Sequence, residues 1–167
     1  MPVERAGLLI SAAVAIGASL ACTSVSQASE FSSMSFMVGT WSCSGQAVDG
    51  TTFRVTETSK LSADGTRLVT SDSSGKVSTE LRYDAARKLW VETSVNANDG
   101  SNSSETSPGW DGNTLVFTGQ VNIKGVQSLG YRSTTTKLSN TRTKQVDELQ
   151  GPTGWMQFDT ATCEKTQ

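Results

Sequence analysis

Apolar side chains recur at every second position over several short stretches of the chain. Residues 77–84 read VSTELRYD and residues 114–122 read TLVFTGQVN, so one face of each stretch is mainly apolar and the other mainly polar. This period is typical of a β-strand with one face toward a core. After residue 29 the 3.6-residue period of an amphipathic helix is almost absent, and we expect only one helical turn, at residues 32–37.

Turn signals separate these stretches. Asp-Gly is a strong hairpin signal because glycine adopts the positive φ of a tight turn, and it begins at Asp49, Asp64, Asp99 and Asp111. The breaks predict strands at residues 39–47, 52–61, 66–72, 77–84, 88–95, 114–122, 126–138, 141–149 and 155–163. Residues 103–110 are a candidate for one more strand, but the very polar stretch 96–108 is more typical of a mobile loop.

Nine or ten hairpin-linked strands predict an all-β fold. The expected architecture is a single up-and-down antiparallel β-barrel, because closure removes the exposed strand edges that a long meander would leave. Leu, Ile, Val and Phe are sparse after residue 29. A thin apolar core suits a barrel with a partly polar or hollow interior better than a densely packed β-sandwich, which is the alternative fold.

The N-terminal segment predicts an export signal rather than part of the fold. Residues 6–21 are an uncharged apolar run of 16 residues. Such a run is short for a membrane span, which needs roughly 20 residues, but it suits a secretory signal peptide. Ser26 and Ala28 stand at the −3 and −1 positions of a small-residue cleavage site. The sequence thus predicts a signal peptide at 1–28, a β-barrel domain at 29–167 and a periplasmic or secreted protein without a membrane span.

The three cysteines agree with export. Cys22 either leaves with the signal peptide or, in the alternative, is the attachment site of a lipid anchor. Cys43 and Cys163 then remain, and an even pair in an exported domain predicts a disulfide, the alternative being two free buried thiols. A barrel makes the first and last strands neighbours, as a disulfide requires. The bridge would close a loop of roughly 120 residues and contribute about 4–5 kcal/mol on the loop-entropy model.

Composition excludes several kinds of chemistry. The chain has no histidine, which removes Ser-His-Asp and Cys-His nucleophile systems and His-ligated zinc and haem. Its net charge of −2 and pI of about 5.1 argue against nucleic-acid binding, which needs clustered basic residues. The spacing of the carboxylates selects neither a catalytic pair nor a calcium loop. We expect no enzyme activity, no metal site and no cofactor.

A short motif carries a family resemblance. Residues 36–45 read FMVGTWSCSG, and this segment resembles the opening strand of calycin-type barrels, in which the tryptophan of a Gly-x-Trp strand plugs one barrel end. These barrels include lipocalins, fatty-acid-binding proteins and nitrobindin-like domains. The chain also resembles small exported bacterial barrels of an uncharacterised family through Tyr83-Asp84, Trp90-Val91, Gly109-Trp110-Asp111-Gly112 and Leu115-Val116-Phe117.

The resemblance implies a small hydrophobic or amphipathic ligand inside the barrel. The haem of nitrobindin-like domains is not implied, because their haem-ligating histidine has no counterpart here. Lipocalins place an arginine near the chain end against the first-strand tryptophan, and this chain has Lys165 near its end instead. Six side chains are candidate ligand contacts: Trp41, Phe53, Glu57, Phe117, Arg132 and Trp155.

The choice of these candidate contacts depends on the strand face that each side chain occupies. Trp41 and Trp155 are expected to face the interior or to seal its base, since each shares a face with a cysteine of the predicted bridge. Arg132 falls on the same face as Val126 and Leu138, and an inward arginine would hold a ligand carboxylate. Alternatively, twists or bulges bring the charged side chains to water.

Two functions are consistent with these features. The first is an exported binding module that holds a small ligand inside its barrel. The alternative is a structural or protein-interaction domain of the cell envelope, with a barrel filled by its own side chains. A cavity beside Trp41 would favour the first.

Overall fold

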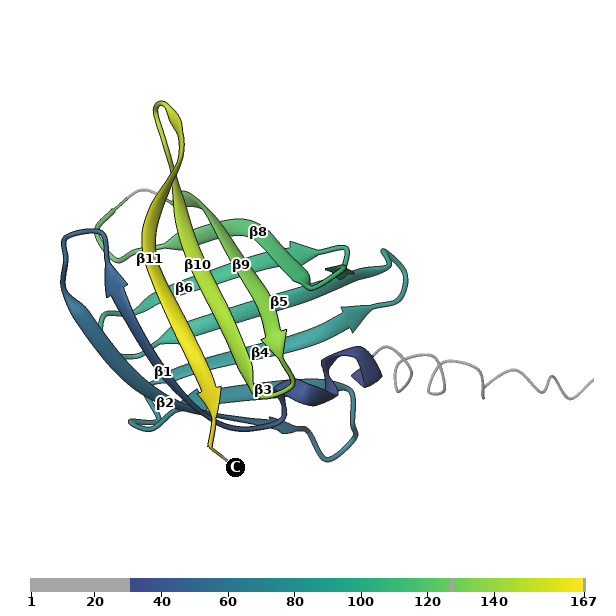
Figure 1. Cartoon of the computed structure of the whole chain (residues 1–167). Helices are drawn as coiled ribbons and strands as arrows, with labels where there is room; N and C mark the ends of the chain where they lie inside the picture. Colours follow the sequence, from purple (N-terminus) through teal and green to yellow (C-terminus); the bar gives the residue numbers. More distant parts are fainter. Residues whose placement is uncertain (1–30, 127, 167) are drawn as a thin grey trace, which may run out of the picture.

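The computed structural model describes residues 31–126 and 128–166, which form a 3-10 helix followed by eleven strands (Figure 1). The predicted signal peptide, its cleavage site and Cys22 lie outside the described residues. The elements are η1 (Phe31–Met37), β1 (Gly39–Ala47), β2 (Thr52–Leu61), β3 (Arg67–Asp72), β4 (Val77–Asp84), β5 (Leu89–Asn96), β6 (Ser101–Ser107), β7 (Trp110–Asp111), β8 (Thr114–Asn122), β9 (Leu129–Ser139), β10 (Arg142–Gly151) and β11 (Gly154–Lys165). No helix in this part of the chain has the length and apolar character of a bilayer span.

The strands close into an antiparallel up-and-down barrel of ten strands, which confirms the predicted fold over the sandwich. Each wall strand pairs with its neighbour along the chain, β6 pairs with β8, and β1 pairs with β11. The two-residue β7 only forms a small hairpin with β8. In Figure 1 the β10–β11 hairpin extends beyond the rest of the wall.

The seam between β1 and β11 carries the predicted disulfide. The register places Cys43 opposite Cys163, their Cα atoms are 3.9 Å apart, and the sulfurs are bonded at 2.06 Å. The first and last strands of the barrel are therefore joined covalently as well as by backbone hydrogen bonds.

Strand β6 confirms part of the candidate strand at residues 103–110 and corrects the loop expected at residues 96–108. Residues Ser101–Ser107 form a wall strand that pairs with β5 on one side and β8 on the other. The stretch has no apolar residue to mark its inward face, so its alternation is invisible in a hydropathy pattern. Its inward positions are serines and one glutamate.

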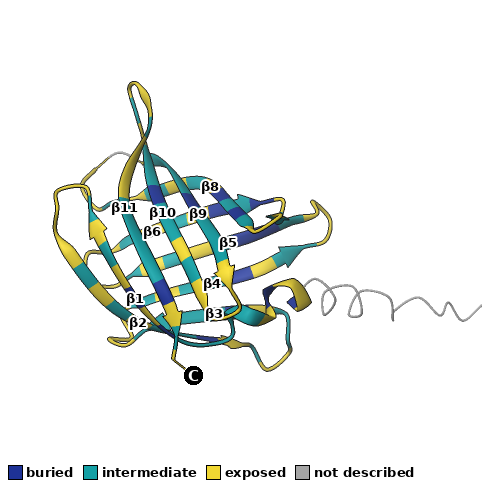
Figure 2. Ribbon diagram, in the orientation of Figure 1, coloured by how far each residue is buried: buried dark blue, intermediate teal, exposed yellow. Residues whose placement is uncertain are grey.

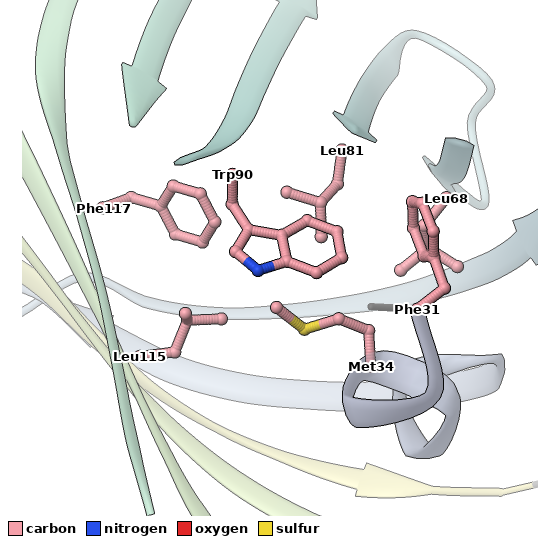
Figure 3. Packing of buried hydrophobic residues seen from close by; sticks show 7 residues of the cluster. All are labelled: Phe31, Met34, Leu68, Leu81, Trp90, Leu115 and Phe117. Carbon is pink, nitrogen blue, oxygen red and sulfur yellow. The ribbon is translucent and has the colours of Figure 1, made fainter. Parts of the chain in front are cut away.

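Helix η1 fills one end of the barrel, which we call the closed end. Phe31 and Met34 point from η1 into a cluster of apolar side chains, and Phe31 packs edge-on against Trp90 with ring centroids 4.9 Å apart (Figure 3). The remaining members of the cluster are Leu68, Leu81, Leu115 and Phe117. This cluster is the largest apolar core in the described part of the chain.

Away from the closed end most wall residues are only half-buried (Figure 2). Their inward side chains are small and polar, for example Thr70, Thr79 and Thr135. Because such side chains do not fill the barrel, the middle and far end are hollow. This agrees with the thin core expected from composition.

Glycine permits the closest approach between two wall strands. Gly119 of β8 lies opposite Glu105 of β6, and a Cβ atom at position 119 would overlap the carbonyl oxygen of Ser104 and lie 2.7 Å from the Cα atom of Glu105. Strand β6 can therefore take its place in the wall only against a residue without a side chain.

Candidate functional site

Two adjoining cavities occupy the barrel interior. The first, the floor cavity, has a volume of about 160 Å³ and lies against Phe36, Trp41 and Phe117 near the closed end. The second, the mouth cavity, has a volume of about 510 Å³ and reaches the β5–β6 turn at Asp99. Five residues line both cavities: Val77, Thr79, Glu92, Ser133 and Gln145. The interior is thus lined continuously from an aromatic floor to the turns at the other end.

The aromatic floor is held in place by polar contacts. The indole Nε1 of Trp41 donates a 2.8 Å hydrogen bond to the carbonyl oxygen of Met37. The Nζ atom of Lys165 donates to the carbonyl oxygen of Phe36 at 3.0 Å and lies 5.6 Å from the Trp41 ring centroid. Lys137 Nζ lies 4.3 Å from the Phe36 ring centroid. Lys165 therefore packs on the first-strand tryptophan, where the resemblance implies an arginine.

The walls above the floor are acidic. The strand register places two carboxyl side chains directly opposite each other on three pairs of neighbouring strands, and like charges in such positions repel. These cross-strand carboxyl pairs are Glu57–Asp72, Glu92–Glu105 and Asp147–Asp159. Neither cavity has a lysine or arginine among the described residues that line it.

The Glu92–Glu105 pair contains Glu105, the least exposed of the six paired carboxyl residues. Burial raises the pKa of Glu92 to about 8, and the neighbouring carboxyls of Glu105, Asp147 and Glu57 add to the effect. Burial also raises the pKa of Glu105 to about 7. Glu105 is only 2% exposed, and no described residue gives its Oε2 atom a hydrogen bond. At neutral pH a large share of this pair therefore carries protons.

The carboxyls of Asp147 and Asp159 face each other across β10 and β11, close enough for the charge of one to act on the other. Burial raises the pKa of both groups, that of Asp159 to about 7. The Gln145 amide donates to both oxygens of Asp147, at 3.2 and 3.0 Å. Burial and the nearby carboxylates raise the pKa of Tyr131, which keeps its hydroxyl a donor.

The Glu57–Asp72 pair differs because one member is part of a turn. The Asp72 carboxylate accepts hydrogen bonds from the Ser74 hydroxyl and from the backbone N–H groups of Lys76 and Val77, and these bonds lower its pKa. Burial, followed by the charges of Asp72 and Asp147, raises the pKa of Glu57. The two members of this pair are thus shifted in opposite directions, with the pKa of Asp72 lowered and that of Glu57 raised.

Three of the six predicted ligand contacts meet in one place. Trp41, Glu57 and Phe117 all line the floor cavity. Phe53 lines neither interior cavity: its ring lies against Gly45, beside a shallow hollow that it shares with Arg54. The remaining two candidates, Arg132 and Trp155, also line neither cavity.

Arg132 points outward instead of into the barrel. Its neighbours Tyr131 and Ser133 line the cavities, and its guanidinium forms hydrogen bonds of 2.6 and 2.7 Å with both carboxylate oxygens of Glu148. The residues used to assign its face do not belong to one regular strand. Val126 precedes β9, and Leu138 falls where the register of β9 and β10 shifts.

Trp155 lies beneath this ion pair, 4.7 Å from the guanidinium carbon of Arg132. The register of β10 and β11 shifts by one residue, because Asp147 pairs with Asp159 whereas Glu148 pairs with Gln157. This bulge reverses the alternation along β11. Trp155 therefore does not share a face with Cys163, as an unbroken strand would require.

Sequence reasoning missed the interior carboxyls Glu92, Glu105, Asp147 and Asp159. Glu92 follows Trp90 by two residues, so an inward Trp90 would have placed it in the interior. No comparable sequence signal marks Glu105 or Asp159, since one lies in a strand without apolar residues and the other beside the bulge.

Comparison with known proteins assigns the chain to no group. No family model matches it, and no curated protein shows significant similarity to its sequence.

Proposed function

We propose that this protein is a binding module that holds a small amphipathic molecule inside its barrel. The observation that carries the proposal is the adjoining pair of cavities between the Trp41 floor and the turns around Asp99. Their volumes, about 160 and 510 Å³, suit a small ligand, since such sites commonly span about 300–1,000 Å³. A hollow barrel favours this function over the cell-envelope domain with a filled interior.

The lining supports an amphipathic ligand over a purely apolar one. Trp41, Phe117 and Leu115 form an apolar surface at the floor. Hydroxyl, amide and carboxyl groups line the remainder, and an apolar group placed against them would leave them without hydrogen-bond partners. The apolar part of the ligand therefore belongs at the floor and its polar part beside the walls.

The proposal places the protein outside the cytoplasm and gives it no cofactor. The apolar N-terminal run and the Cys43–Cys163 disulfide support export. The absence of histidine and of a recognisable catalytic motif supports binding over catalysis.

Titration with the neutral fluorescent dye N-phenyl-1-naphthylamine tests the proposal. We expect the dye to bind in the micromolar range and to quench tryptophan emission by energy transfer. Thr79 lines both cavities, so Thr79→Leu should fill the space where they adjoin and weaken dye binding at least tenfold.

The matched control is Thr93→Leu, which adds the same bulk to the exposed face of β5 and should bind the dye like the parent protein. Circular dichroism checks that both variants fold. Equal dye affinity in the two variants, or no binding by the parent protein, would contradict an interior site.

A further inference from the structure

The cross-strand carboxyl pairs lower the stability of an empty barrel. Each pair must either keep two like charges close together, where the interior screens them weakly, or hold a proton that an exposed carboxyl would release at neutral pH. Apart from Asp72, which caps a turn, none of the six has an ion-pair or turn-capping role among the described residues. What the other five share is a position at or beside the cavities.

Glu105 supplies an independent sign of a missing donor. Its side chain lines the mouth cavity, is 2% exposed, and has an Oε2 atom with no hydrogen-bond partner among the described residues. A buried acceptor without a donor is costly, and native proteins rarely leave one unsatisfied. An N–H group entering the cavity would satisfy it.

We propose that the ligand is an organic cation, a small primary amine with an apolar tail, whose ammonium group lies between Glu92 and Glu105. This inference rests on the proposed function and names the ligand class for the same cavities. The ammonium offers three N–H donors to the carboxylates. Its tail lies toward Trp41 and Phe117 at the floor.

The spacing of the acidic groups favours an organic cation over a metal ion. In the part of the chain that the structure describes, no three carboxyl or thiol groups converge closely enough to hold a metal. The carboxyls instead follow the length of the interior, from Glu57 near the floor to Asp159 in the mouth cavity. A metal ion needs its ligands gathered around one point, whereas an ammonium group needs only one facing pair such as Glu92 and Glu105.

Binding of the amine is expected to displace protons from the interior carboxyls. The charges that act on Glu92 are those of Glu105, Asp147 on β10 and Glu57 on β2, all of them acidic. Asp147 also acts on Glu105, and Tyr131 on β9 is a further titratable group near it. Across β8 the neighbour of Glu105 is Gly119, which cannot titrate. The two lysines of the closed end, Lys137 and Lys165, contact the floor aromatics. An incoming ammonium lowers the pKa of the carboxyls, so protons leave and the affinity rises from pH 6 to pH 8.5.

Three octyl compounds with the same tail test the inference by isothermal titration calorimetry at pH 8. We expect octylamine, cationic at this pH like the lysine side chain, to bind at least tenfold more tightly than 1-octanol, and octanoate to bind most weakly. If octanol or octanoate binds as tightly as octylamine, the proposal of a cationic ligand is overturned, whereas the proposed interior site is not. If none of the three binds and the neutral dye does not bind either, the proposed function fails and this inference with it.

Two variants test whether Glu92 and Glu105 cause the preference for octylamine over octanol. The double variant Glu92→Gln/Glu105→Gln keeps the shape of the lining and should lose the amine preference at least tenfold while still binding octanol. The control Glu164→Gln makes the same chemical change on the exposed face of β11 and should bind like the parent protein. Titrations in two buffers of different ionisation enthalpy should show proton release by the parent protein and none by the double variant. Unchanged octylamine affinity in the double variant would overturn the assignment.

Discussion

Replacing Gly119 with valine is expected to prevent the barrel from closing between β6 and β8. A side chain at this position overlaps the backbone of Ser104 and crowds the Cα atom of Glu105, and backbone cannot move aside as a flexible side chain can. Overpacking between these two paired strands, together with the loss of pairing along β6, should lower the free energy of unfolding by about 4 kcal/mol or more.

Urea unfolding followed by tryptophan fluorescence measures this cost. Thr118→Val places the same valine side chain at the neighbouring exposed position, where it only exchanges a hydroxyl for a methyl group, and should change the unfolding midpoint little. A Gly119→Val protein with the midpoint of Thr118→Val would contradict the close β6–β8 contact.

The empty protein is expected to lose stability as the pH rises from about 5 to about 9. Interior carboxyls with a raised pKa bind protons more tightly when folded than when unfolded, so the free energy of unfolding falls as pH rises through the folded pKa. Burial raises the pKa of Glu105 from 4.5 to about 7. That shift alone corresponds to at most about 3 kcal/mol, fully lost above the folded pKa.

Chemical denaturation at the two pH values measures the effect. Between the two pH values the free energy of unfolding should fall less in Glu105→Gln than in the parent protein. At pH 9 the variant should be the more stable of the two. Glu164→Gln, altered on the outer surface, should keep the full pH dependence. Stability that increases toward pH 9, or an unchanged slope in Glu105→Gln, would contradict a buried acidic interior.

The architecture could be predicted because its signals are local. The alternation in β4 and β8 and the Asp-Gly turns depend on neighbouring residues, and they define strand number and connection order. The pairing of Cys43 with Cys163 is predicted from an even pair of cysteines in an exported domain, and closure agrees with it, because a closed meander brings its first and last strands together.

The interior site could not be predicted because it depends on register and on bulges. Whether Glu92 faces Glu105 is decided by which residues of β5 and β6 pair, and no short-range pattern encodes this. A single extra residue in β11 turns Trp155 away from the face of Cys163. Alternation counted along the sequence fails at such points, although it holds within each regular strand.

The acidic pairs also explain why the sequence pattern is weakest where the site lies. Wall strands that surround a polar cavity do not need apolar inward residues, so β6 has only serines and Glu105 facing inward. Such a wall lowers the stability of the fold, as functional sites commonly do. The disulfide and the apolar closed end supply stability elsewhere.

A carbon-13 NMR titration of the side-chain carboxyls in the empty protein tests the acidic interior most directly. We expect the Glu92 and Glu105 carboxyls to titrate near pH 8 and pH 7, whereas Glu148, hydrogen-bonded to Arg132 on the outer face, should titrate below its ordinary range. Titration of every glutamate between about pH 4 and 5 would contradict the facing carboxyls, since groups with that ordinary pKa are solvated or paired with a cation.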